Sequence, residues 1–150
     1  MNSYNGFLPA QRNRALRWIK AEYAAGRRQR HTVCQGCGQD RGVIGGHSED
    51  YSEPFGDHIG AYGLCYTCHM MVHNRFQHPG AWDRYRAAVR KGLMFEPFRT
   101  RNFGKFCALF LGPEIRANAS MRLFPCPLVL DEIAARPVPD QAAPLYGDGE

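Results

Sequence analysis

Two Cys-x-x-Cys pairs, Cys34/Cys37 and Cys65/Cys68, are the residues whose types and spacing point most clearly to chemistry. Two residues between thiolates allow both sulfurs of a pair to reach one tetrahedral ion. The two pairs together therefore predict one four-thiolate site for Zn²⁺ with a structural role. Two disulfides, or thiols with no common role, are the alternative interpretation.

Two histidines, His69 and His73, follow the second cysteine pair directly. A spacing of four residues places both imidazoles on one face of a helix, where they can share an ion or a substrate group. We therefore expect a second site beside the first. In the alternative arrangement the zinc is held by Cys65, Cys68, His69 and His73, and the first cysteine pair serves another purpose.

The run from His47 to Pro54, followed by Leu64-Cys65-x-x-Cys68-His69-x-x-x-His73, resembles the HNH endonuclease family in its zinc-bearing phage and bacterial form. The resemblance implies an α+β fold with a small zinc-stabilised treble-clef or ββα-metal core, made of a hairpin and a helix and flanked by α-helices. It also implies hydrolysis of phosphodiester bonds in double-stranded DNA. The cofactors would be a structural Zn²⁺ and a separate catalytic Mg²⁺ or Mn²⁺, in a prokaryotic or phage-encoded, cytoplasmic protein.

The resemblance assigns roles in two registers. When the family motif is aligned on Asp50-Tyr51-Ser52, His47 takes a metal-ligand position and Ser48 stands in place of the general base. When the motif is instead counted forward from Cys37, His47 falls at the position of the general base. We favour His47 as the base, because a nuclease can replace one metal ligand by water more easily than it can lose its base; a neutral imidazole can accept a proton from water near pH 7.

The family's middle asparagine falls on Gly60, so His58 or Asp57 could substitute for it. The expected catalytic residues are His47, Ser48 and His58, and the expected ligands of the catalytic metal are His69, His73 and Asp50.

Charge suggests a polyanionic partner. The chain has 150 residues, a formal net charge of +5 and a pI of about 9.0, which favours a polyanionic partner. No N-terminal signal peptide and no apolar run long enough for a bilayer are evident, so we expect neither secretion nor a membrane partner; homodimerisation is left open. The expected DNA contacts are Arg27, Arg28, Arg30, Arg75, Arg99 and Arg101.

Periodicity and glycine or proline punctuation predict the elements that would position these residues. A strand through Val43 and Ile44 should end at His47, and Gly45 and Gly46 should leave room for a close approach. Helices are expected over residues 9–25, 64–76, 79–92 and 128–135. The organisation would be a basic helical arm (1–33), the HNH-like core (34–76), a basic helical extension (77–136) and a disordered acidic C-terminal tail (137–150).

Three features of the flanks carry further expectations. Phenylalanines alternate with basic residues over 95–112, which suits either stacking on nucleic acid or a small hydrophobic core, and the core is favoured. On the first helix, Arg12, Arg14 and Arg17 fall off the apolar stripe and should face outward. Cys107 and Cys126 are expected to be free thiols.

Two other functions are compatible with this sequence. Ser48 and Gly60 stand where relatives carry chemically active side chains, which suggests a zinc-finger protein that binds nucleic acid without cutting it. A purely structural zinc module that docks onto a protein partner is the third candidate.

Overall fold

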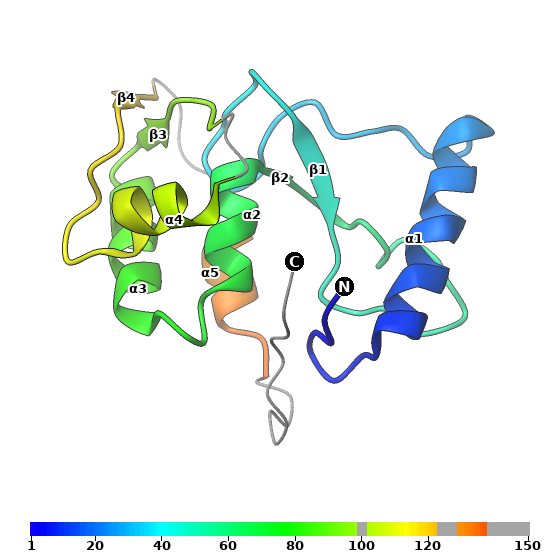
Figure 1. The fold of residues 1–150 in the computed structure, drawn as a ribbon. Coiled ribbons are helices and arrows are strands. Elements are labelled where there is room, and N and C mark those ends of the chain that lie inside the picture. The colour runs from blue at the N-terminus through cyan, green and yellow to red at the C-terminus, as the bar shows by residue number, and fades with distance from the viewer. Residues whose placement is uncertain (99–101, 123–128, 138–150) are drawn as a thin grey trace.

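The fold is α+β, with five α-helices and two two-stranded antiparallel sheets among the residues described by the computed structural model, which are 1–98, 102–122 and 129–137 (Figure 1). The helices are α1 (Pro9–Ala24), α2 (Tyr66–His73), α3 (Pro79–Arg90), α4 (Phe103–Phe106), which continues into the π-helical turn η1 (Cys107–Leu111), and α5 (Val129–Ala134). The strands are β1 (Ile44–His47), β2 (Tyr62–Cys65), β3 (Leu93–Phe95) and β4 (Ala119–Met121). Arg99, Arg101, Cys126 and the acidic tail from residue 138 onward lie outside the described residues.

A hairpin that leads directly into a helix lies at the centre of the fold. Strand β1 pairs with β2 from Ile44 opposite Cys65 to His47 opposite Tyr62. Helix α2 begins directly after Cys65, the last residue of β2. The helix predicted from near Leu64 to about residue 76 is present, but α2 begins two residues later and ends three residues earlier. Leu64 pairs across the sheet with Gly45, and the Cys65 side chain accepts a hydrogen bond from the Cys68 N–H at the first turn of α2, so the chain changes from strand to helix there.

Glycine at position 46 allows the close approach that the sequence suggested. A Cβ on Gly46 would lie 3.2 Å from Gly60 Cα and 3.1 Å from the Tyr23 hydroxyl, whereas one on Gly45 would meet nothing within 4 Å. The prediction is therefore confirmed for Gly46 alone. Gly60 itself has φ +63°, a conformation that side chains other than glycine rarely adopt.

Helix α1 lies on the far side of the hairpin from α3 and α4 (Figure 1). It ends one residue earlier than expected, and Gly26 follows in a left-handed conformation with φ +74°. The expectation that Arg12 faces outward is wrong, because its side chain is buried and its guanidinium lies over the rings of Tyr4 and Tyr51. Aromatic faces attract a guanidinium, so this polar side chain can lie inside a small apolar cluster.

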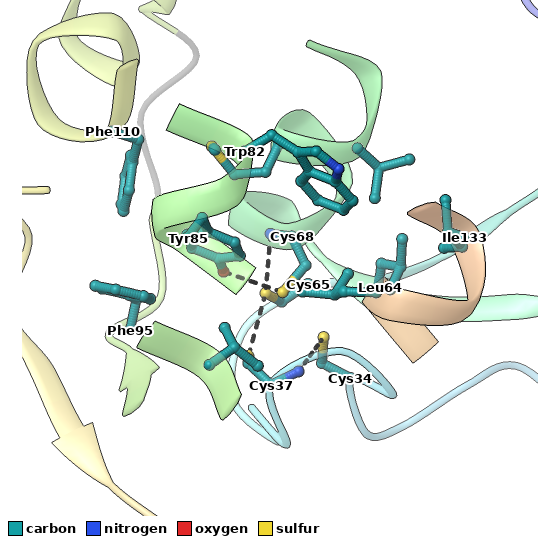
Figure 2. Close-up of a cluster of buried hydrophobic side chains, with 14 of the residues drawn as sticks. Cys34, Cys37, Leu64, Cys65, Cys68, Trp82, Tyr85, Phe95, Phe110 and Ile133 are labelled. Carbon is teal, nitrogen blue, oxygen red and sulfur yellow. Dashed lines mark hydrogen bonds between the residues drawn. The ribbon is translucent and has the colours of Figure 1, made fainter. Parts of the chain in front are cut away.

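The larger core lies on the other side of the hairpin and surrounds the four cysteines (Figure 2). Trp82, Tyr85 and Val89 are buried on α3, as their helical spacing predicted. Phe106 and Phe110 pack against each other with ring centroids 4.9 Å apart, and both are buried. The phenylalanines on α4 and η1 therefore belong chiefly to the core, as favoured.

Strand β3 pairs with β4 beside this core, and α5 is joined to α3 by ion pairs from Arg86 and Arg90 to Asp131. Within the described residues, no helix combines the length and apolar character needed to cross a membrane.

Replacing Phe106 by alanine should destabilise the protein by about 3–5 kcal/mol, because the substitution leaves a cavity in the larger core. Phe103 on the same helix is 44% exposed, so Phe103→Ala should cost only about 1 kcal/mol, the value of its ring contact with Phe106. Urea denaturation of both variants measures the difference. Equal losses would contradict the assignment of Phe106 to the core.

Candidate metal centres

Four cysteines from two distant segments form one buried cluster. Cys34 and Cys37 lie on a turn before β1, while Cys65 ends β2 and Cys68 lies in the first turn of α2. Their sulfurs all lie within 4.8 Å of one another, and the Sγ atoms of Cys37 and Cys65 are 3.7 Å apart. All four thiols are free, so neither pair is a disulfide. The cluster could hold a metal ion such as zinc.

The surroundings of the cluster suit thiolates bound to a cation. Backbone N–H groups of Cys37 and Cys68 point at the sulfurs of Cys34 and Cys65, at 3.4 and 3.5 Å. The Tyr85 hydroxyl lies 3.0 Å from Cys68 Sγ, where it can donate to a thiolate (Figure 2). Burial and the neighbouring sulfurs raise the pKa of Cys68 well above its ordinary value. Four closely spaced buried thiols therefore need a positive ion before they can ionise together.

Three imidazoles form a second cluster beside the first. His47 ends β1, and His69 and His73 lie one turn apart on α2. One ring nitrogen of each lies within 4.8 Å of the others, and the Nε2 atoms of His69 and His73 are 3.0 Å apart. The cysteines and the histidines form separate groups, which argues against the mixed set of Cys65, Cys68, His69 and His73.

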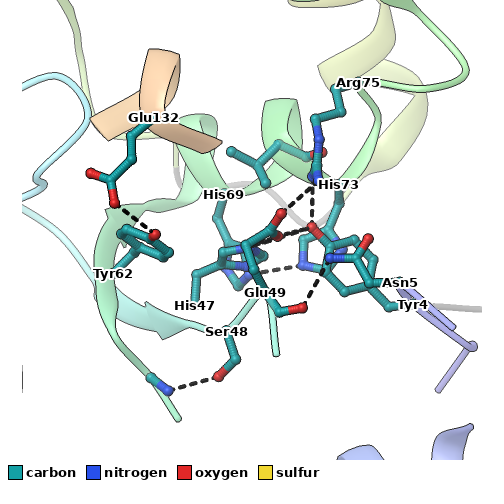
Figure 3. A network of polar contacts seen from close by, with 12 residues as sticks. Tyr4, Asn5, His47, Ser48, Glu49, Tyr62, His69, His73, Arg75 and Glu132 are labelled. Carbon is teal, nitrogen blue, oxygen red and sulfur yellow. Dashed lines mark hydrogen bonds and ion pairs between the residues drawn. The ribbon is translucent and has the colours of Figure 1, made fainter. Parts of the chain in front are cut away.

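Sequence reasoning missed Glu49, which is buried next to this cluster (Figure 3). Its Oε2 lies 2.7 Å from His47 Nε2, and its Oε1 accepts a hydrogen bond of 2.6 Å from Arg75. Tyr4 donates a hydrogen bond to the same carboxylate. A signal for Glu49 was available, because residues two apart in an extended segment point to the same side. Nothing in the sequence indicated Tyr4.

Electrostatics keep the three imidazoles neutral, which is the form that binds metals. Burial lowers the pKa of His47. Burial, with the neighbouring His47 imidazole and the charge of Arg12, lowers the pKa of His69 to about 3, and burial also lowers that of His73. Burial would raise the pKa of Glu49, but the hydrogen bond from His47 and the charge of Arg75 outweigh it and lower the pKa to about 2.

The other residues predicted for the catalytic site, Ser48 and His58 as catalytic residues and Asp50 as a metal ligand, do not join the imidazole cluster. The Ser48 hydroxyl accepts a hydrogen bond of 2.7 Å from the Gly60 N–H, which ties the end of β1 to the following loop. His58 Nε2 lies 2.8 Å from the Ser52 carbonyl oxygen. The Asp50 carboxylate accepts from the Ser52 N–H at 2.8 Å and caps a local turn. Neither His58 nor Asp50 belongs to a metal-compatible group among the described residues.

The predicted DNA-contacting arginines lie in different environments. Arg27 is exposed and pairs with Glu22 at 2.9 Å, and Arg30 is exposed with its guanidinium 4.5 Å from the Tyr23 ring centre. Arg28 donates to the Ile59 carbonyl at 3.0 Å. The prediction that Arg75 contacts DNA is wrong, because its guanidinium is buried and bound to Glu49 and Tyr4.

Comparison with known proteins adds no assignment. No protein-family model, no curated protein and no solved structure gives a significant match to this chain. The function of this protein must therefore be inferred from the geometry of its two side-chain clusters.

Removing the metal should unfold the larger core, because binding at such thiolate sites contributes folding free energy, about 10–16 kcal/mol in small zinc peptides. Cys68→Ser should weaken the thiolate-to-metal charge-transfer absorption of the Co²⁺-substituted protein, because one of four thiolates is lost, and should lower its melting temperature. Cys107→Ser, outside the cluster, is the matched control and should change neither. A Cys68→Ser protein with unchanged absorption and melting temperature would rule the site out.

Proposed function

We propose that this chain is a metal-dependent DNA endonuclease of the HNH type, which hydrolyses phosphodiester bonds. The observation that carries the proposal is the convergence of His47 from the hairpin with His69 and His73 from the helix. Such a hairpin and helix, joined at a cysteine cluster, are the parts of the ββα-metal core that the resemblance implies. Two ligand groups of different chemistry suit two ions with different roles.

We further propose that the cysteine cluster binds zinc in a structural role. A tetrahedral ion with Zn–S bonds of about 2.3 Å places its sulfurs roughly 3.8 Å apart, and the Sγ atoms of Cys37 and Cys65 are 3.7 Å apart. Because Cys68 immediately precedes His69, zinc binding would order the first turn of α2 and with it the second cluster.

The imidazole cluster is suited to a transition-metal ion. Neutral imidazoles bind Zn²⁺, Mn²⁺, Co²⁺ or Ni²⁺, whereas Mg²⁺ prefers oxygen ligands and retains several waters. With Asp50 bound in a local turn, we propose Mn²⁺ or another transition metal rather than Mg²⁺. When bound, this ion would supply a Lewis acid for the scissile phosphate and lower the pKa of an attacking water.

The roles of the chain's own residues follow from their contacts. His47 lies in the imidazole group and its Nε2 is bound to Glu49, so we propose it as a metal ligand rather than as the general base. Ser48 then occupies the base position. Exposed Arg27 and Arg30 at the end of α1 are proposed to contact the phosphate backbone, which would position the duplex without reading its sequence.

Purified protein should nick supercoiled plasmid in the presence of Mn²⁺, and His69→Ala should reduce cleavage to background because one of three metal ligands is lost. His78→Ala is the matched control, since His78 is exposed and lies outside the cluster, and it should retain wild-type activity. Gel electrophoresis of the plasmid forms measures both. No cleavage by the wild-type protein with any divalent ion would refute the enzyme proposal.

The second candidate function is DNA binding without cleavage, and Ser48 specifically favours it. A hydroxyl is a poor base near neutral pH, and this one already accepts a hydrogen bond from Gly60. A protein that has lost the base could keep both metal sites and its affinity for DNA.

This candidate predicts salt-dependent DNA affinity that survives loss of the imidazole cluster. Arg27→Ala together with Arg30→Ala should weaken binding and lower the slope of log K against log salt by about 2, because each phosphate contact contributes roughly one counterion. His69→Ala should leave the affinity nearly unchanged. Fluorescence anisotropy at several salt concentrations measures the slope. Lack of DNA binding even at low salt would instead favour a zinc module with a protein partner.

A further inference from the structure

We propose that Glu49 is the positioning residue of the imidazole cluster, which holds the His47 ring so that its Nδ1 lone pair is available to the metal ion. This inference deepens the proposed function and rests on its three-imidazole site. Glu49 would not bind the ion itself, because its carboxylate does not belong to the metal-compatible group.

The carboxylate of Glu49 determines which nitrogen of His47 carries the proton. The Arg75 guanidinium is ion-paired with Glu49 at 2.6 Å, and an ionised carboxylate can only accept hydrogen bonds. The contact of 2.7 Å between Glu49 Oε2 and His47 Nε2 therefore requires the proton on Nε2. In a neutral imidazole the other nitrogen, Nδ1, then carries the lone pair.

The Nδ1 atom of His47 is buried and has no hydrogen-bond partner among the described residues. The His47 ring centre lies 5.0 Å from that of His69 and 5.1 Å from that of His73. A buried acceptor without a partner costs free energy, and a cation shared with the two α2 imidazoles would satisfy it. Carboxylates that fix a ligating histidine in this way are common around protein metal sites.

Glu49 is itself held by residues from distant parts of the chain. Arg75 follows α2 and Tyr4 lies near the N-terminus, and both donate to the Glu49 carboxylate (Figure 3). Arg75 also donates to the Tyr4 hydroxyl at 2.6 Å, and the Tyr4 ring lies 4.6 Å from that of His73. Two separate segments therefore fix the carboxylate of a third, which leaves His47 little freedom to turn.

Titration with Co²⁺ of protein that carries one equivalent of zinc at the cysteine site and none at the imidazole site tests this positioning role. Glu49→Gln keeps the side-chain shape but removes the charge, so the Co²⁺ concentration for half-saturation of the imidazole site should rise about 10–100-fold. Glu53→Gln is the matched control, because Glu53 is exposed and its ion pair is with Arg14, away from the cluster, and its affinity should stay within about twofold of wild type. Unchanged zinc content of the cysteine site shows that the variant is folded.

A second measurement requires no substitution. Two-bond ¹H–¹⁵N correlation spectra of the metal-free imidazole site distinguish the two tautomers of His47, and the proposal expects a protonated Nε2 and an unprotonated Nδ1. Protonated Nδ1, or Glu49→Gln with wild-type Co²⁺ affinity, overturns the positioning role. Wild-type protein that binds no Co²⁺ at this site refutes the second metal site of the proposed function instead, and a protein that binds Co²⁺ normally but cuts no DNA refutes only the nuclease activity.

Discussion

The rest of the structure depends on the junction between β2 and α2, where Cys65, Cys68 and His69 follow one another within a single turn. Four buried thiols cannot all ionise without a cation among them. Once such an ion is bound, the turn that carries Cys34 and Cys37 is fastened to this junction. The same segment carries His69 and His73, two of the three imidazoles. An ion bound to the cysteines would therefore also hold these two imidazoles in place, because they follow Cys68 on the same helix.

A second constraint is the buried charge beside the imidazoles. Glu49 and Arg75 are both nearly inaccessible to water and form an ion pair, and removing two charges from water costs several kcal/mol for each. Such a buried ion pair adds little to the free energy of unfolding, because the cost of desolvation offsets the attraction between the charges. It does, however, define geometry, because a buried carboxylate with several donors has very few alternative positions. This property suits a site whose ligands must keep a fixed orientation.

The N-terminal segment contributes more to this site than its position in the chain suggests. Helix α1 closes a small apolar cluster against the loop after β1, and buried Arg12 lies over two tyrosine rings there. One of those rings belongs to Tyr4, which also reaches Glu49. The arm is therefore part of the framework around the imidazole cluster.

The sequence by itself determined the local parts of this protein. The spacing of Cys34/Cys37 and Cys65/Cys68 identified a ligand set, the interval between His69 and His73 placed both on one helical face, and proline, glycine and apolar periodicity located α1 and α3 to within about two residues. These features depend on near neighbours in the chain, and local stereochemistry is sufficient to reveal them.

Only the tertiary structure decided which residues meet across the chain. The pairing of β1 with β2 brought His47 to the α2 imidazoles and turned Leu64 into a strand residue, and the packing of the N-terminus placed Tyr4 beside Glu49. Arg12 and Arg75 look like surface charges in the sequence, yet aromatic rings and a carboxylate from distant segments make their burial favourable. No local pattern encodes such partners, because their energies arise only when segments far apart in sequence exclude water together.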